Sequence, residues 1–342
     1  MTLGEIITQR KDRWIRFFES GSPRILFVVN IQNETPTRPL PHPDKKDDRI
    51  NWAWEKYNKM IENLNWLEDD SIPYLDIYTG TEIFAEAFGC KVHRPDTDMP
   101  FALPKVSSFQ EANKIQIPEL GSSPLMLLFE VAESLRFKAG EDALVRMVDT
   151  QGPMDITALI WDKNSFYRSL LEAPDAVKEL CKKVKNFEIN FLDTWFNRFG
   201  REFIAHYPEY YMPFGITLSE DEIGVVSREM FDEFFLPELV DLSDHFGLMG
   251  LHCCAHAKHQ WNNLKKIPNL KLLNLVQPEK ILTEAFSFYA PICAQMHSWS
   301  GNGEPWTWPK QLPENARVVM QIDVDTKEKA YEVTSRLREL LE

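Results

Sequence analysis

Amphipathic helical segments alternate with short apolar segments along this chain of 342 residues, and this order constrains the fold more than any other feature. Residues 3–20 carry apolar side chains at helical spacing, and residues 24–30 (RILFVVN) contain a short continuous apolar run with several β-branched residues, which is typical of a strand buried on both faces. Further strand-like runs lie at 73–77, 143–148, 203–205, 215–218, 248–253, 270–276 and 318–322. Further helical segments lie at 51–67, 81–88, 125–137, 173–198 and 227–245.

Strands that alternate with helices along a chain pair in parallel, with the helices packed outside them. No linker rich in Gly or Ser interrupts the alternation. The sequence therefore predicts a single α/β domain, a (β/α)8 TIM barrel over 24–342, with an N-terminal helical extension at 1–23. Because barrel enzymes carry their chemistry on the loops that follow the strands, the strand ends are the first places to expect functional residues.

The charge and the apolar content exclude several classes of protein. The chain has 38 basic and 52 acidic residues, a net charge of −14, so its surface repels nucleic acid and anionic lipid. No apolar run approaches the roughly 20 residues that a membrane span needs, and the first residues lack the pattern of a signal peptide. Five cysteines are odd in number and too few for a disulfide framework. We expect a cytoplasmic protein with free thiols.

The most specific local motif is the pair His252 and Cys254 at the end of an apolar run. In extended backbone, residues two apart point to the same side. Imidazole and thiolate are donors that Zn²⁺ prefers, and a catalytic zinc site has three protein ligands and an open position. The third ligand is predicted to be Cys293, with His297, His256 and His259 as alternatives. The competing interpretation is that these cysteines and His252 are buried core residues.

Three acids, Glu220, Asp221 and Glu222, follow another strand-like run. Glu220 and Asp221 come shortly after residues 215–218, and either would serve as a general acid or base if its surroundings raised its pKa. The competing interpretation is that these acids cap the helix that begins near Ser227 or face water.

Aromatic residues gather in two predicted loops. Tyr210 and Tyr211 lie in one, and Trp299 and Trp306 in the other. If the loops face each other, these side chains form an aromatic cavity that binds a flat macrocycle or a methylammonium group. Alternatively, the tryptophans cover their own part of the core.

Several segments resemble the uroporphyrinogen decarboxylase superfamily, in the same order along the chain. They are residues 151–158 (QGPMDITA), 173–175 (APD), 227–237 (SREMFDEFFLP), 273–278 (LNLVQP) and 320–323 (MQID). The resemblance implies a distorted (β/α)8 barrel. The superfamily's decarboxylases carry an Arg-Gln-Ala-Gly-Arg signature after the first strand, whose arginines hold substrate carboxylates, whereas this chain has NIQNE at residues 30–34.

The chain is more similar to the corrinoid-linked methyltransferases of the superfamily, which carry His-x-Cys after a strand, as His252 and Cys254 do here. That resemblance implies a zinc-dependent transfer of a methyl group between a corrinoid, carried by a partner protein, and a thiol or pterin-like acceptor. In the family the third ligand is a Cys nearer the C-terminus, but no Cys follows Cys293 in this chain. The alternatives are a decarboxylase of a tetrapyrrole or another carboxylated substrate, and a non-catalytic tetrapyrrole-binding barrel.

Overall fold

The computed structural model describes residues 1–19, 22–32 and 37–341, and it confirms the predicted α/β barrel. Six parallel strands form one sheet in the order β1 (Ile25–Ile31), β12 (Val318–Val324), β11 (Ala294–Gln295), β10 (Leu270–Leu275), β9 (Met249–Cys253) and β8 (Ile216–Ser219). Two further parallel strands, β2 (Tyr74–Leu75) and β5 (Leu144–Val145), pair with each other. Both strands are shorter than the apolar runs predicted at 73–77 and 143–148, so the length of an apolar run overestimates the length of the strand inside it.

The two parallel sheets are joined differently on their two sides. After β5, Gln151 forms a parallel bridge with Ser219 at the end of β8. On the other side, the segment before β2 reaches β1 through acidic side chains. Asp70 accepts a hydrogen bond from the Phe27 amide at 3.0 Å, and Asp69 accepts one from the Val29 amide at 2.9 Å. Carboxylates thus satisfy part of the edge of β1, and the barrel is distorted there.

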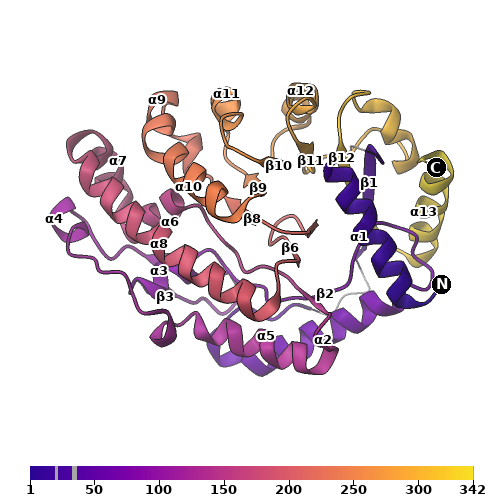
Figure 1. The fold of residues 1–342 in the computed structure, drawn as a ribbon, viewed down its shortest axis with the longest axis horizontal. Helices are drawn as coiled ribbons and strands as arrows, with labels where there is room; N and C mark the ends of the chain where they lie inside the picture. Colours follow the sequence, from indigo (N-terminus) through magenta and orange to yellow (C-terminus); the bar gives the residue numbers. More distant parts are fainter. Residues whose placement is uncertain (20–21, 33–36, 342) are drawn as a thin grey trace.

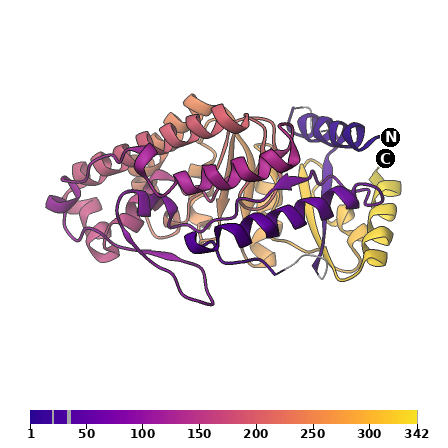
Figure 2. The ribbon, with the colours of Figure 1, turned by 90° about the horizontal axis from the view of Figure 1, so that it is seen from below.

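Helices cover the outside of the strands, and both termini lie at the same end of the molecule (Figures 1 and 2). The longer helices are α1 (Leu3–Glu19), α2 (Lys46–Asn63), α5 (Met126–Ala139), α6 (Pro153–Ile160), α7 (Lys163–Glu172), α8 (Pro174–Phe199), α10 (Leu236–Phe246), α12 (Glu279–Tyr289) and α13 (Lys327–Leu341). The short ones are α3 (Ile83–Ala87), α4 (Phe109–Ala112), α9 (Arg228–Met230) and α11 (Trp261–Leu264). Two hairpins, β3 (Lys91–His93) with β4 (Phe101–Leu103) and β6 (Phe203–Ile204) with β7 (Tyr211–Met212), are antiparallel.

Two helical regions differ from the prediction. The predicted helix at 227–245 begins with α9, capped by the Ser227 side chain, continues as a π-helical turn (Phe231–Phe235) and ends as α10. The segment at 153–160 was not predicted as a helix, because α6 is buried almost all round and so has no amphipathic pattern. Its helical start is set by Pro153, whose φ suits the first turn.

The core fills the barrel and the space between the strands and the helices. A smaller apolar cluster lies between β1, β12 and α13. None of the helices within the described residues has a stretch with the length and hydropathy of a membrane span.

Candidate active site

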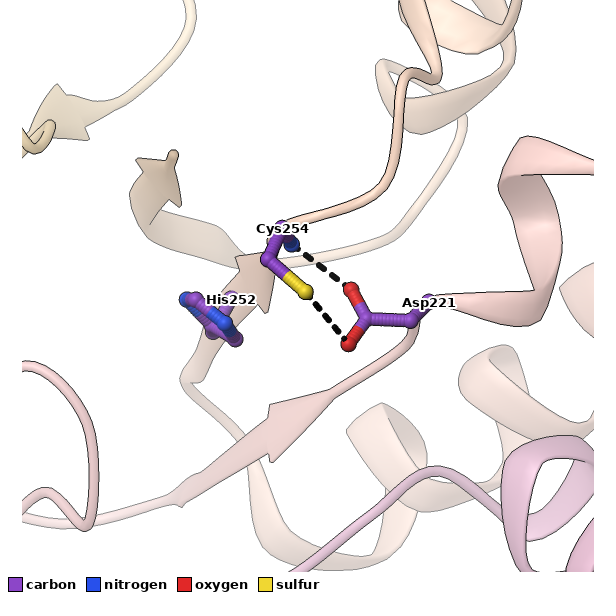
Figure 3. Close-up of side chains that lie close together, drawn as sticks. All are labelled: Asp221, His252 and Cys254. Carbon is purple, nitrogen blue, oxygen red and sulfur yellow. Dashed lines mark hydrogen bonds between the residues drawn. The ribbon is translucent and has the colours of Figure 1, made fainter. Parts of the chain in front are cut away.

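Three potential metal donors meet at the carboxyl ends of neighbouring strands. Asp221 lies two residues after the end of β8. His252 is the second-to-last residue of β9, and Cys254 directly follows β9. Their donor atoms lie within 4.8 Å of one another (Figure 3). The Cys254 thiol donates a hydrogen bond to Asp221 Oδ2 at 3.0 Å, and the Cys254 amide donates one to Asp221 Oδ1 at 2.6 Å. The Asp221 carboxylate therefore holds both the side chain and the backbone of Cys254.

The His252 imidazole is oriented by the next strand. Its Nδ1 lies 2.5 Å from the Asn274 side-chain oxygen on β10, and the Asn274 amide nitrogen donates to the Met296 carbonyl. Since Asn274 presents its oxygen, Nδ1 carries the proton and Nε2 keeps its lone pair. A hydrogen bond of this kind on the second ring nitrogen is typical of metal-binding histidines.

The electrostatics of the cluster fit a bound cation. Burial, together with the hydrogen bond and the charge of Asp221, raises the pKa of the Cys254 thiol to about 12, so that Cys254 is a neutral thiol beside the carboxylate. Burial also lowers the pKa of His252, which keeps the imidazole neutral and able to bind a metal. A divalent cation between these groups would turn the thiol into a thiolate. One imidazole, one thiolate and one carboxylate are a suitable donor set for zinc.

The structure does not bring Cys293 to this cluster, which corrects the predicted third ligand. Gln295 of β11 and Leu251 of β9 both pair with Leu273 of β10, so Cys293 lies toward the opposite end of the strands from His252. A sequence has no signal for such a register, because it depends on where β11 begins.

The histidines predicted as alternative third ligands either have other hydrogen-bond partners or lie outside the cluster. Both ring nitrogens of His297 have partners, the Leu275 amide at 3.0 Å and Gln295 at 2.9 Å. His259 contacts the Val226 carbonyl at 2.9 Å, and His256 is exposed and outside the cluster. Within the described residues, Asp221 is the acid that completes the group with His252 and Cys254.

The cluster opens into a cavity of about 420 Å³. Its wall also includes Tyr78, Thr79, Arg146, Asp149, His206 and Tyr207. The Tyr207 ring contacts the His252 ring edge-on, with their centroids 4.7 Å apart. Arg146 is held in place by Asp76 at 2.9 Å and by Glu209 at 3.1 Å. Sequence reasoning did not single out Asp149 or His206, since no motif surrounds them.

Glu220 points away from this cavity, unlike its neighbour Asp221. It is buried behind Gly152, where a Cβ at residue 152 would lie 1.6 Å from a Glu220 carboxylate oxygen. Burial and the neighbouring Asp155 raise the pKa of Glu220 far above its usual range. Glu220 is therefore not placed to act on a ligand in the cavity, which corrects its prediction as a catalytic acid or base.

The predicted aromatic residues lie elsewhere too. Tyr210 stacks on Trp14 at 6.3 Å, and it lines a different cavity together with Tyr211. Trp299 contacts Phe286 and Trp308 edge-on, at 5.3 and 5.8 Å.

Trp306 packs under two cations of α13, Lys329 and Arg336. The tryptophans thus cover their own part of the molecule, as the alternative interpretation had it. Of the residues that the structure describes, Tyr207 and Tyr78 are the tyrosines at the wall of the His252 cavity.

A parallel barrel with a polar cavity and a donor cluster at the carboxyl ends of its strands defines an enzyme-like site. The sequence matches the family Uroporphyrinogen decarboxylase (URO-D) over residues 69–281, which is more than half of the chain, and the protein belongs to this family. Among solved structures, a methyltransferase from Methanosarcina mazei is similar, with a TM-score of 0.67 and 12% identity. The alignment covers 97% of this chain and 99% of the other, so the two proteins share the whole fold. No curated protein matches the sequence.

The segment after β1, where the family's decarboxylases carry their arginine signature, has no arginine at residues 30–34 in this chain. Asn30 and Gln32 are exposed at the end of β1, and Asn33 and Glu34 lie outside the described residues.

Proposed function

We propose that this protein is a zinc-dependent methyltransferase that moves a methyl group from a corrinoid, carried by a partner protein, to a small thiol. The observation that carries this proposal is the convergence of Asp221, His252 and Cys254 at the edge of a 420 Å³ cavity. Family membership and the methyltransferase with the same fold support it.

Asp221, His252 and Cys254 would hold the zinc. Bound zinc lowers the pKa of a thiol that binds to it, which keeps the sulfur nucleophilic at neutral pH. Three protein donors leave one position of a tetrahedral site for this thiol. Asn274 fixes the His252 ring, and Tyr207 covers one edge of it, so the donors are preorganised.

The cavity itself would bind the small acceptor. Its volume fits a compact molecule rather than a whole tetrapyrrole, so a corrinoid would approach from outside, on its carrier protein. The methyl group would then be the only part of the donor that enters.

Methyl transfer between two defined probes tests the proposal. Protein loaded with zinc is incubated with methylcobalamin and 2-mercaptoethanol, and the methyl thioether is quantified by mass spectrometry. We expect turnover with the unmodified protein and with the matched control Cys181→Ser, and a loss of at least about 100-fold with Cys254→Ser. Equal rates for Cys254→Ser and Cys181→Ser would contradict the proposal.

A second candidate, decarboxylation of a small carboxylated substrate, is favoured by one observation. The Arg38 guanidinium stacks on Tyr78 at 3.4 Å, at the wall of the same cavity, and it has no acidic partner within the described residues. A cation in this position is suited to hold a carboxylate. Release of carbon dioxide from such a substrate, without any need for methylcobalamin, would favour this candidate over methyl transfer.

A further inference from the structure

Asp149 lies on the cavity wall but is not one of the three donors of the metal cluster. It follows β5, and its backbone amide donates to the Thr79 hydroxyl at 2.8 Å. One carboxylate oxygen, Oδ1, accepts a hydrogen bond from the Gln151 side chain at 2.6 Å. The other, Oδ2, has no hydrogen-bond partner among the residues that the structure describes. The carboxylate is therefore fixed in direction, with one oxygen available.

The groups around Asp149 raise its pKa, but the carboxyl group is still ionised at neutral pH. His206 Nε2 lies 3.7 Å from Oδ1, and burial lowers the pKa of His206 so far that it stays neutral. Arg146 is the nearby cation, but Asp76 and Glu209 already pair with it. Tyr78, Glu82 and Asp221 face Asp149 as well. Burial is the largest effect, and it raises the pKa of Asp149 to about 6.

The other acids on the cavity wall already have partners within the protein. Within the described residues, the cavity is lined by three acids, Asp149, Glu209 and Asp221. Glu209 pairs with Arg146 at 3.1 Å, and Asp221 holds Cys254. Asp149 is thus the carboxylate that can take up a proton without breaking an ion pair or the donor cluster.

We propose that Asp149 is the general base that receives the proton of the acceptor thiol. This inference rests on the proposed function. The S–H bond of the thiol breaks, its electron pair stays on sulfur, and the proton moves to Asp149 Oδ2. The sulfur then uses that pair to form the S–CH3 bond, while the carbon–cobalt bond of the donor breaks and leaves its pair on cobalt, which changes from Co(III) to Co(I). After the thioether leaves, Asp149 returns the proton to solvent.

Proton uptake on thiol binding tests this role without turnover. Binding of 2-mercaptoethanol to the zinc-loaded protein is measured by calorimetry in phosphate and in Tris near pH 7.5, and in acetate and in MES near pH 5.5. The two buffers of each pair differ in ionisation enthalpy, which gives the number of protons released. Near pH 7.5 Asp149 is ionised in the free protein, and the negative thiolate that forms beside it raises its pKa further. Asp149 then keeps the proton of the thiol, so the unmodified protein should release much less than one proton. Near pH 5.5 Asp149 is already largely protonated, so most of one proton should appear in the buffer. Release of about one proton at both pH values would overturn the proposal.

Variants sharpen the test. Asp149→Asn keeps the shape but cannot accept a proton, so it should release about one proton at both pH values and lose about 100-fold in kcat/KM for methyl transfer near pH 7. Asp149→Glu should recover part of that loss, and Asp96→Asn, on the exposed β3–β4 loop, should behave like the unmodified protein. An Asp149→Asn protein with normal zinc content and an unchanged rate would overturn the proposal.

These outcomes separate the inference from the proposed function. If the unmodified protein transfers methyl groups but releases a full proton at both pH values, the role of Asp149 alone fails. If the protein binds no zinc and transfers no methyl group, the proposed function fails with it. Should Asp149→Asn not fold, the pH dependence of proton release in the unmodified protein still decides.

Discussion

Glu220 and Asp221 are adjacent in the sequence and lie in opposite environments. Asp221 faces the cavity and holds Cys254, whereas Glu220 is buried among other acids behind the strand. Asp155 lies beside Glu220, and its carboxylate accepts hydrogen bonds from the backbone amides of Asp221 and Glu222, at 2.6 and 2.9 Å. Glu188 of α8 is completely buried nearby, and neither of its carboxylate oxygens has a hydrogen-bond partner in the part of the chain that the structure describes.

The difference between these two acids arises just past the end of β8, where the backbone leaves the extended conformation at Asp221 and the two neighbouring side chains point to opposite sides. The carboxylate on the open side can meet a cation or a ligand. The one on the closed side can stay buried only if it keeps its proton, because an isolated buried charge is very costly. Asp155 and Glu220 share a hydrogen bond in a buried place, so they cannot both ionise, and burial raises the pKa of Asp155 to about 7. The inner acids thus shape the loop that presents the outer one.

The largest expected effect concerns zinc affinity. Asp221→Asn removes the charge of a proposed ligand, so we expect it to weaken zinc binding by at least about 100-fold. Glu220→Gln, one residue away, should leave the affinity within a few-fold of the unmodified protein. Competition with a chromophoric chelator measures both. An equal loss in the two variants would show that the cluster depends on the shape of the loop rather than on the Asp221 carboxylate.

A smaller effect concerns the free energy of unfolding. Glu188→Met replaces an unpartnered buried carboxyl with an apolar side chain of similar length, so it should raise this free energy by about 1–3 kcal/mol. Glu179→Met, on the exposed side of the same helix, is the matched control and should change it by less than about 0.5 kcal/mol. Urea denaturation gives both values. Destabilisation by Glu188→Met would mean that Glu188 has a buried partner.

The last expected effect is a pH dependence of stability. The pKa of Glu220 is raised in the folded state, so the folded protein binds a proton there that the unfolded chain has lost above its usual carboxyl pKa. The contribution of Glu220 to stability is therefore fully present at acidic pH and is lost as the pH rises. Glu220→Gln removes this loss, so its stability relative to the unmodified protein should be higher near pH 8 than near pH 5. Thermal denaturation of both proteins at the two pH values measures the difference, in which the contributions of the histidines cancel. The same difference at both pH values would contradict the raised pKa.

The barrel was predictable because its signal is repeated along the chain. Each helix and strand contributes one part of the alternation, so short strands such as β2 and the missed helix α6 do not change the outcome. The juxtaposition of His252 and Cys254 was predictable for a local reason as well. Two residues that are two apart in extended backbone point the same way.

The rest of the site depends on contacts between distant segments. Whether Glu220 or Asp221 faces the cavity is decided by Gly152, which leaves room for the Glu220 carboxylate. The exclusion of Cys293 depends on the register of β11 against β10. Asp149 approaches the cluster because β5 and β8 are bridged at Gln151 and Ser219. None of these has a local pattern in the sequence.

The zinc content of three proteins tests the central claim most directly. We expect about one zinc ion per chain in protein purified without chelators. Cys293→Ser should keep the zinc, because Cys293 lies toward the other end of the strands, and Cys254→Ser should lose most of it. Loss of zinc from Cys293→Ser with retention in Cys254→Ser, or equal content in all three proteins, would contradict a zinc site at Asp221, His252 and Cys254.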